Sequence, residues 1–495
     1  MAPENKKALL LSLWLGLTLG SMFFYPLTSS LHDSPYYMHW KPIHSLELLL
    51  AWVFVSAIFF SLMLFSLKKS GTRIGVAVVI IALAFPLISM LLHMARQLKL
   101  DTSLIKFANG YILYGILGGL ALLIAVIVLA DGFQNLRRKF QSALVIFLLV
   151  ISPMNLTSAY AVFKSGHFLS RQAFRQNAER PKDEKNSAMP YGDIYIIVFD
   201  EMSYEYLYEN KNVKGAFPNI KAFSSQADNY HLASAPGDST ESSMPGILMG
   251  LRKVKLKIKG DNIYISEENK ELLPLKLDAE NLPSTARAKG YKTALYGWYH
   301  DYCKMFGNVL DECRSFSLYN YSDVNERFSV LDPVRTTFIL WPYVKPAGYF
   351  KVPVYSEFHK RNVEAIYRLA VSYLGKSEAS FVFIHFPIPH IPFVYGPDGY
   401  NPPPDPYLPS EQNYIKQLKY VDRLFGDFIG KMKVTGKYEK SAVVLMSDHN
   451  FREKAERMQW TRIPLVVKRP KQTLRMDFGE PAYASAVLKN LIENN

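Results

Sequence analysis

The sequence predicts two unlike parts, an N-terminal five-helix transmembrane bundle and a C-terminal α/β domain whose mostly parallel central sheet is covered by helices. The first third of the 495-residue chain consists mainly of long apolar runs, and ~20 apolar residues are enough to cross a bilayer as a helix. In the remainder, short runs of β-forming residues alternate with helix-like stretches, which is typical of an α/β domain. The clearest of these helices is predicted at residues 411–432, where apolar residues recur at helical spacing.

Five apolar runs make up the membrane domain that we expect at residues 1–160. They cover residues 9–27, 48–67, 74–94, 111–130 and 143–160. Lys6 and Lys7 before the first run are a feature of signal peptides, but four further runs favour a permanent signal anchor. Buried helices of a soluble protein are rarely apolar on every side over such lengths, so membrane-spanning helices are the better interpretation.

Basic residues between the runs predict the orientation, because loops rich in Lys and Arg stay on the cytoplasmic side. Such clusters precede the first run, separate the second from the third and separate the fourth from the fifth, at residues 6–7, 68–73 and 137–139. The opposite loops carry fewer basic residues. An odd number of spans then places everything after residue 160 outside the cytoplasm.

The formal net charge of the chain is +14, which raises the question of an anionic partner. Its Lys and Arg residues do not cluster in a recognition helix or on an aromatic and basic platform, as nucleic-acid binding would require. We therefore expect no nucleic-acid partner. The positive charge is better explained by attraction to an anionic membrane surface or an anionic substrate.

Residues of metal-ligating types follow one predicted strand after another in the C-terminal domain, residues 191–495, which a juxtamembrane helix or linker at residues 161–190 precedes. The strands are predicted at residues 193–200, 292–295, 380–385, 441–446 and 462–468. The ligand-type residues that follow them are Asp200, Glu201, His300, His390, Asp448 and His449. Each alone also fits a structural role, such as a helix cap. Because the carboxyl ends of parallel strands meet at one edge of a sheet, together they predict a metal centre.

A loop rich in Gly and Ser, residues 235–250 (APGDSTESSMPGILMG), adds a candidate nucleophile, Thr240. We expect this loop to run into a helix that begins near Pro245. Backbone N–H groups and the helix dipole make such a place suitable for an anionic phosphoryl or sulfuryl group. A Thr hydroxyl is a weak nucleophile unless a base or a metal ion activates it, so the loop and the predicted metal centre belong together.

In their order along the chain, these motifs resemble the alkaline phosphatase superfamily, specifically its sulfatase-like branch. The resemblance extends to membrane-anchored lipid A phosphoethanolamine transferases and lipoteichoic acid synthases. The segments that carry it are VFDE, the Thr240 loop with Gly250 ten residues on, YKTALYGWYH, HFPIPHIPF, SAVVLMSDHN and RIPLVVKRP. In these segments His300 and His390 fall on family histidines, and Trp298 stands where sulfatases have a lysine.

Two departures refine what the resemblance implies. Type I sulfatases convert a Cys or Ser to formylglycine and need an Arg four residues on, whereas this chain has Thr240 and Met244. The chain also has no His after His449, where lipid A phosphoethanolamine transferases carry one. Lipoteichoic acid synthases ligate metal through Glu, Thr, Asp and His, which this chain matches. Both transferase groups place five spans before an extracytoplasmic catalytic domain, which implies a multi-pass protein of the bacterial inner membrane.

The resemblance implies a metal-dependent transferase. It would move a phosphoethanolamine or phosphoglycerol head group from a phospholipid donor to a glycan or lipid acceptor through a phospho-threonine intermediate. The expected metal ligands are Asp200, Glu201, Thr240, Asp448 and His449, with His300 and His390 binding phosphoryl oxygens or donating a proton. Strand register favours Asp200 as the acidic ligand and the transferases' glutamate favours Glu201. Oxygen and imidazole ligands suit Zn²⁺ or Mn²⁺, with Mg²⁺ and Ca²⁺ as further candidates. The alternatives are a membrane-anchored phosphodiesterase or sulfatase-type hydrolase, and a catalytically degenerate scaffold.

Cys303 and Cys313 are the only cysteines of the chain. In an oxidising compartment we expect them to form a disulfide that braces the loop after His300. The close CxxC spacing of zinc-cysteine sites is absent.

Overall fold

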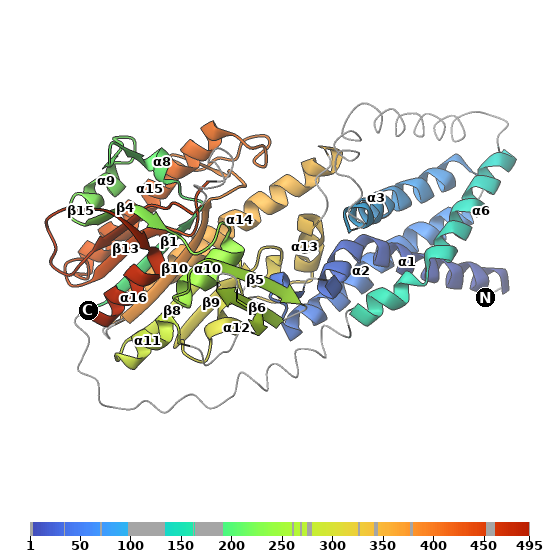
Figure 1. Ribbon diagram of the computed structural model, residues 1–495. Helices are drawn as coiled ribbons and strands as arrows, with labels where there is room; N and C mark the ends of the chain where they lie inside the picture. The colour runs from blue at the N-terminus through green and yellow to red at the C-terminus, as the bar shows by residue number, and fades with distance from the viewer. Residues whose placement is uncertain are drawn as a thin grey trace. The chain divides into compact units, whose positions relative to one another are not determined.

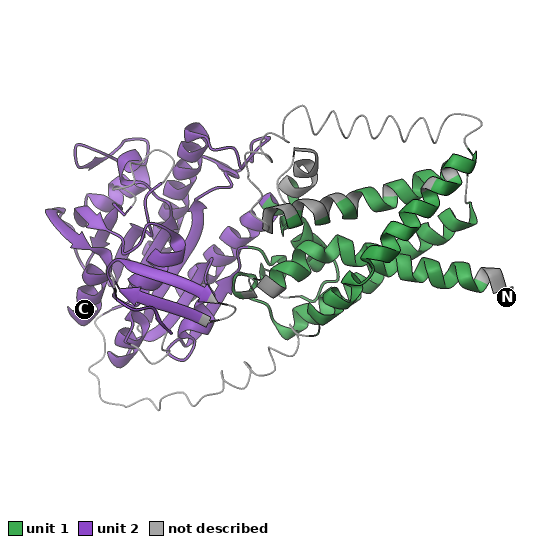
Figure 2. Cartoon of the chain, turned by 45° about the vertical axis from the view of Figure 1, so that its right-hand side comes forward, with its two compact units in different colours: residues 1–172, 319–355 green, residues 173–318, 356–495 purple. Residues whose placement is uncertain are grey.

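The computed structural model describes residues 3–33, 35–69, 72–97, 134–161, 163, 192–259, 262–267, 270–274, 280–324, 327–340, 345–376, 380–451 and 461–494 (Figure 1). The chain divides into two compact units, which Figure 2 distinguishes. Unit 1 contains Met1–Gln172 and Tyr319–Tyr355, and unit 2 contains Ala173–Leu318 and Ser356–Asn495. The segment 319–355 thus belongs to the unit of the apolar helices, although it lies inside the sequence predicted for the catalytic domain.

Unit 1 consists mainly of helices, and two of them are long and apolar enough to cross a membrane. These spans are Lys6–Leu31, in α1 (Pro3–Asp33), and Pro42–Lys68, which is α2. A third arises if Gln134–Ile151 (α6) and Met154–Ala161, which meet at a bend of 44°, count as one. The described residues therefore show two or three candidate spans, and the predicted five are not shown.

The other predicted spans are not found as full-length membrane-spanning helices, for a different reason in each case. The run at residues 111–130 lies outside the described residues. The run at residues 74–94 falls in α3 (Arg73–Gln97), within which Arg73–Ala84 is apolar but shorter than a bilayer requires. The bend in the fifth run coincides with a turn at Ser152 and Pro153, because proline cannot donate the helical hydrogen bond.

The segment 319–340 contacts the helices of unit 1 through buried polar groups. It contains the 3-10 helix η2 (Tyr321–Val324) and α13 (Asp332–Leu340). Asp323 lies 3.3 Å from Nδ1 of His39, and the amide of Ser329 donates to Glu47 at 2.9 Å. Buried charged groups are tolerated when they are paired in this way. The 3-10 helix η1 (Pro35–Met38) lies just before His39 in the chain.

The centre of unit 2 is an eight-stranded sheet in the order β15-β4-β14-β13-β1-β10-β8-β9. The strands are β1 (Ile194–Asp200), β4 (Asp228–Ser234), β8 (Lys292–Trp298), β9 (Glu312–Phe316), β10 (Ser380–Pro389), β13 (Ala442–Ser447), β14 (Leu465–Lys468) and β15 (Met476–Tyr483). Five adjacent strands from β13 to β9 are parallel, and β14 is antiparallel to both of its neighbours. The mostly parallel sheet predicted from the sequence is confirmed.

Continuous apolar runs put this sheet in the interior. Every residue of β1, β10 and β13 is buried. Successive side chains of a strand point to opposite faces, so both faces of the central strands are covered (Figure 1). The covering helices include α9 (Pro218–Ser224), α10 (Thr240–Leu248), α11 (Leu282–Ala288), α14 (Lys345–Tyr373), α15 (Glu411–Val434) and α16 (Ala484–Asn494).

Helix α15 forms where helical periodicity predicted it. Ser410 caps its start by accepting a hydrogen bond from the amide of Asn413 at 3.3 Å. Its buried stripe includes Tyr414, Leu418 and Phe425, and it packs on β10 and α9. The stripe recurs every three to four residues, as an amphipathic helix requires.

Helix α10 begins at Thr240, five residues before the predicted start near Pro245. Ser239 is its extended N-cap residue, and the amides of Ser242 and Ser243 already bond to the Ser239 carbonyl at 3.1 and 2.8 Å. The proline therefore lies inside the helix, where it costs one backbone hydrogen bond. As a result Thr240 occupies the first position of the helix, whereas the sequence predicted it in the loop before the helix.

Candidate active site

The sheet register brings two aspartates together. Strands β1 and β13 are parallel neighbours, with Phe199 opposite Ser447. Asp200 ends β1 and Asp448 directly follows β13, so both emerge at the carboxyl edge of the sheet. Both carboxylates are fully buried. The edge predicted from the strand ends is therefore where these side chains meet.

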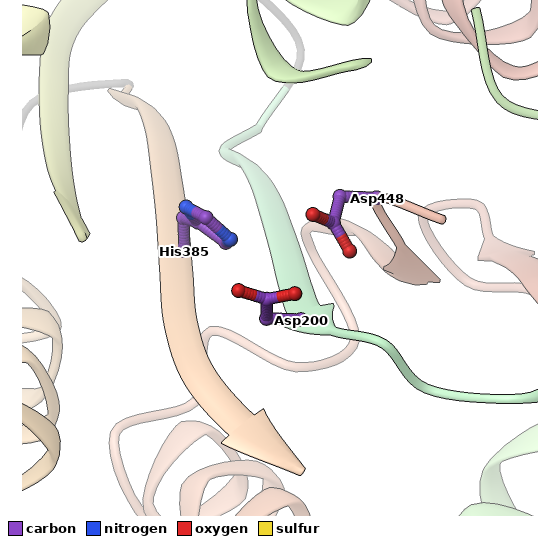
Figure 3. A group of neighbouring side chains, drawn as sticks. All are labelled: Asp200, His385 and Asp448. Atoms are coloured by element: carbon purple, nitrogen blue, oxygen red, sulfur yellow. The ribbon is translucent and has the colours of Figure 1, made fainter. Parts of the chain in front are cut away.

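A histidine that the sequence did not single out completes the group. His385 lies within β10, and one ligand atom from each of Asp200, His385 and Asp448 falls within 4.8 Å of the others (Figure 3). The strand predicted at residues 380–385 ends at His385, but the ligand-type residue chosen there was His390. The observed β10 continues past His385 to Pro389. The available signal was the residue itself, a lone imidazole inside an otherwise apolar strand, which must find a polar partner once buried.

Two buried atoms of this group have no hydrogen-bond partner among the described residues, Nε2 of His385 and Oδ2 of Asp448. Nδ1 of His385 lies 3.1 Å from the carbonyl of Trp298. A carbonyl only accepts, so Nδ1 carries the proton and Nε2 keeps its lone pair. Burial lowers the pKa of His385 to about 4, which keeps the ring neutral near pH 7. Two carboxylates and a neutral imidazole with orphaned atoms fit a divalent cation.

The hydroxyl of Thr240 points at the same group. Its Oγ1 lies 3.3 Å from both carboxylate oxygens of Asp200 and 3.2 Å from Nε2 of His449. Nδ1 of His449 lies 3.0 Å from the carbonyl of Asn450, so by the same argument Nε2 is an acceptor. The Thr240 hydroxyl proton therefore faces a carboxylate and an imidazole lone pair.

Asp448 is held as a carboxylate. Burial by itself raises its pKa. The positive charge that His449 and His385 carry once protonated in acid, together with the amide N–H groups of Glu201 and His449, holds the pKa below the usual range. The two amides donate to Oδ1 at 3.1 and 2.8 Å. Charged acceptors bonded in this way stay ionised.

Glu201 occupies a different place from Asp200. Its backbone is left-handed, with φ of 61°, and its amide donates a hydrogen bond to Oδ1 of Asp448. Its carbonyl accepts the hydroxyl of Tyr414 at 2.7 Å. Among the described residues, Asp200 rather than Glu201 contributes to the three-residue group.

The two remaining predicted histidines flank the group. His300 is buried, and its Nε2 lies 3.1 Å from the carbonyl of Thr240, at the first turn of α10. His390 is half-buried, its amide donates to the carbonyl of Asp200 at 3.1 Å, and its ring centroid lies 5.8 Å from that of Trp298. His300 thus contacts the backbone of Thr240, and His390 lies at the rim.

The predicted disulfide between Cys303 and Cys313 is present, with Cα atoms 5.5 Å apart. It joins α12 (Tyr302–Phe306) to β9. The hydroxyl of Tyr302, the residue before Cys303, lies 2.9 Å from Nδ1 of His385. The disulfide therefore braces the segment that contacts the ring of His385.

Residues 193–487 match the sulfatase family, and the chain belongs to that family, within the alkaline phosphatase superfamily. The superfamily resemblance inferred from the motifs is thereby confirmed. A comparison with curated proteins finds no match.

Several solved structures are similar to part of this chain. Ps i-CgsB in complex with k-i-k-neocarrahexaose is 16% identical, with 62% of this chain and 73% of that chain covered and a TM-score of 0.42. The phosphonate monoester hydrolase SpPMH from Silicibacter pomeroyi is 13% identical, with 60% and 72% covered and a TM-score of 0.41. The lipoteichoic acid synthase LtaP from Listeria monocytogenes is 14% identical, with 65% and 77% covered and a TM-score of 0.37.

Proposed function

We propose that this chain is a membrane-anchored, metal-dependent transferase of the sulfatase family. It moves a phosphoethanolamine or phosphoglycerol unit from a phospholipid to a hydroxyl of a glycan or lipid acceptor. The observation that carries the proposal is the position of Thr240, whose hydroxyl lies 3.2–3.3 Å from Asp200 and His449 at the start of a helix. A hydroxyl so placed is ready to lose its proton and attack the phosphorus atom of an anionic phosphodiester.

Asp200, His385 and Asp448 would hold the divalent cation, with Thr240 and His449 beside it. Such a cation, when bound, lowers the pKa of a neighbouring hydroxyl and neutralises phosphoryl charge. Compared with the ligand set expected from the sequence, this proposal keeps Asp200 and Asp448, adds His385 and omits Glu201. Thr240 and His449, which were expected as ligands, lie beside the cation instead. Zn²⁺ and Mn²⁺ both accept oxygen and imidazole ligands.

The residues then divide the chemistry. Oγ1 of Thr240 gives its proton to Nε2 of His449 and forms a bond to phosphorus, and the bond from phosphorus to the diacylglycerol oxygen breaks. His390, at the rim, donates the proton that the leaving oxygen takes up. Amide groups of the first turn of α10 bind the non-bridging oxygens. In the second step the acceptor hydroxyl gives its proton to His390 and its oxygen bonds to phosphorus. The bond from phosphorus to Oγ1 of Thr240 breaks, and Oγ1 takes back the proton held by Nε2 of His449.

The test is the substitution Thr240→Ala in the full-length protein, reconstituted with radiolabelled phosphatidylethanolamine or phosphatidylglycerol. We expect head-group release and transfer to fall by about 10³-fold or more. Thr240→Ser should keep measurable activity and allow the phospho-enzyme to be trapped and located by mass spectrometry.

Ser242→Ala is the matched control, since Ser242 lies in the same helical turn and bonds within it to Ser239. It should leave the rate nearly unchanged. Wild-type turnover in Thr240→Ala would disprove the nucleophile. Release of head group to water with no gain on adding an acceptor would favour the hydrolase alternative.

A further inference from the structure

A second, smaller sheet of unit 2 carries an unusual row of lysines. It consists of β5 (Val254–Lys259), β6 (Asn262–Glu267) and β7 (Leu273–Pro274), with β5 at one edge. Strand β5 reads VKLKIK, so its two faces are apolar and basic in alternation. Lys255 and Lys257 are exposed, whereas Val254 is buried. We call Lys255 and Lys257, with the residues beside them on that face, the lysine face.

The cross-strand partners of Lys255 and Lys257 on the lysine face are uncharged. In the antiparallel register Lys255 lies opposite Ser266 and Lys257 opposite Tyr264, and cross-strand partners share a face. Within the described part of the chain, neither lysine forms an ion pair. Lysine is disfavoured in strands, and like charges two residues apart repel. This arrangement therefore lowers the stability of the isolated sheet, and an anionic partner would relieve the repulsion.

The small sheet is attached to the segment that carries Thr240. The amide of Val254 donates to the carbonyl of Pro236 at 2.9 Å. A Cβ atom at Gly246, in α10, would stand 2.8 Å from Cγ2 of Val254, so β5 lies directly against that helix (Figure 1). A partner that binds the lysine face is therefore coupled through β5 to α10 and to its first residue, Thr240.

We propose that the lysine face binds anionic phospholipid head groups of the membrane that the chain's own helices enter. The charge complementarity is direct, and each Lys near an anionic leaflet contributes an attraction of about 1 kcal/mol. A tethered domain needs only this weak attraction to stay at the lipid surface. The inference rests on the proposed membrane anchoring and is independent of the catalytic residues.

The experiment uses the full-length protein in nanodiscs of phosphatidylcholine, with and without phosphatidylglycerol. Both native cysteines are in the disulfide, so a single new cysteine takes up a thiol-reactive, polarity-sensitive fluorophore alone. Leu272, directly before β7 and 37% exposed, is the labelling position Leu272→Cys. We expect a blue shift in discs that contain phosphatidylglycerol, and its loss at high salt.

The double substitution Lys255→Gln with Lys257→Gln should reduce the docked-to-free ratio by about 25-fold, since about 1 kcal/mol per lysine is about fivefold each. The matched control is Lys416→Gln with Lys419→Gln on α15, two exposed lysines of the same unit, which should leave the shift intact. Adding Thr240→Ala should also leave it intact, which separates docking from catalysis.

Three results would overturn the proposal. One is an equal signal in both lipid compositions. Another is a signal that appears only when a soluble polyanion such as dextran sulfate is added, which would assign the face to an anionic polysaccharide. The third is increased light scattering of the Lys255 and Lys257 variant with an unchanged blue shift, which would mean that the lysines only protect an edge strand.

Discussion

At the scale of single residues, His385 offers the sharpest test of the proposed metal centre. We expect His385→Leu to weaken metal binding by about 100-fold or more, because loss of a mere outer-shell partner already costs about 10- to 100-fold. Equilibrium dialysis with Zn²⁺ and with Mn²⁺, followed by elemental analysis, measures this. His359→Phe is the control, since His359 is a buried histidine outside the three-residue group. Equal metal content in His385→Leu and wild type would rule out His385 as a ligand.

The buried histidines also predict how stability depends on pH. Burial lowers the pKa of His359 to about 3 and that of His385 to about 4, whereas in the unfolded chain both bind a proton near their ordinary value of 6.5. Between these values the unfolded state binds more protons than the folded state, so stability falls as the pH drops from about 6.5 towards 4. Each pKa unit corresponds to ~1.4 kcal/mol.

His359→Phe removes one of these two contributions and keeps an aromatic ring facing Trp298, whose centroid lies 6.2 Å from that of His359. We expect its melting temperature to fall less than that of wild type when metal-free protein is moved from pH 7 to pH 4.5. Parallel declines in the two proteins would show that His359 does not titrate in this way.

What the sequence predicted at this scale depended on where strands end. Asp200 and Asp448 were predictable, because a buried apolar strand that stops at an acid places that acid at the carboxyl edge of a parallel sheet. His390 was chosen because it follows the strand predicted at residues 380–385 and falls on a family histidine. His385, the last residue of that predicted strand, was not considered, although β10 continues past it to Pro389. Which side chains then meet depends on register between distant strands, and no local pattern encodes that.

At the scale of elements, the disulfide closes a short loop between α12 and β9, ten residues apart. A loop of this length restricts the unfolded chain by about 2–3 kcal/mol. We expect the double substitution Cys303→Ser with Cys313→Ser to lower the melting temperature of the catalytic unit by about 5 °C or more. Calorimetry in the presence and absence of a reductant measures it. A reductant should shift wild type and leave the variant unchanged, and an unshifted wild type would contradict a stabilising role.

Elements with a strong apolar pattern were predictable, and those whose boundaries depend on distant partners were not. The runs of β1, β13 and α15 lie within two residues of their predicted bounds. The start of α10 was misplaced because a proline usually marks a first turn, yet here Ser239 caps a helix that begins at Thr240, five residues before Pro245. Pro245 is buried in the packing around this turn, which offsets the lost backbone bond.

At the scale of the whole molecule, the chain leaves unit 2 after Leu318 and returns to it at Ser356. Residues 319–355 pack with the apolar helices of unit 1, where Asp323 meets His39 and the amide of Ser329 meets Glu47. The sequence gives no local sign of this exchange, because the segment is no more apolar than its neighbours and its partners lie almost 300 residues away. Unit 1 is therefore built in part from sequence within the region that matches the sulfatase family, residues 193–487.

The basic residues around the spans predict an orientation of the chain in the membrane, which can be tested with single cysteines. Both native cysteines are bonded to each other, so an introduced thiol is the one that reacts. Val434, at the end of α15, is 89% exposed, and Lys69, just after α2, is also exposed.

We expect a membrane-impermeant maleimide to label Val434→Cys in cells whose inner membrane is intact, and Lys69→Cys only after that membrane is permeabilised. The physical reason is that basic loops stay on the cytoplasmic side, where the bilayer surface and membrane potential retain them, while the disulfide needs the oxidising side. Labelling of both positions before permeabilisation would place Lys69 outside the cytoplasm and contradict the proposed orientation. If neither position is labelled before permeabilisation, unit 2 lies in the cytoplasm, away from an extracytoplasmic acceptor.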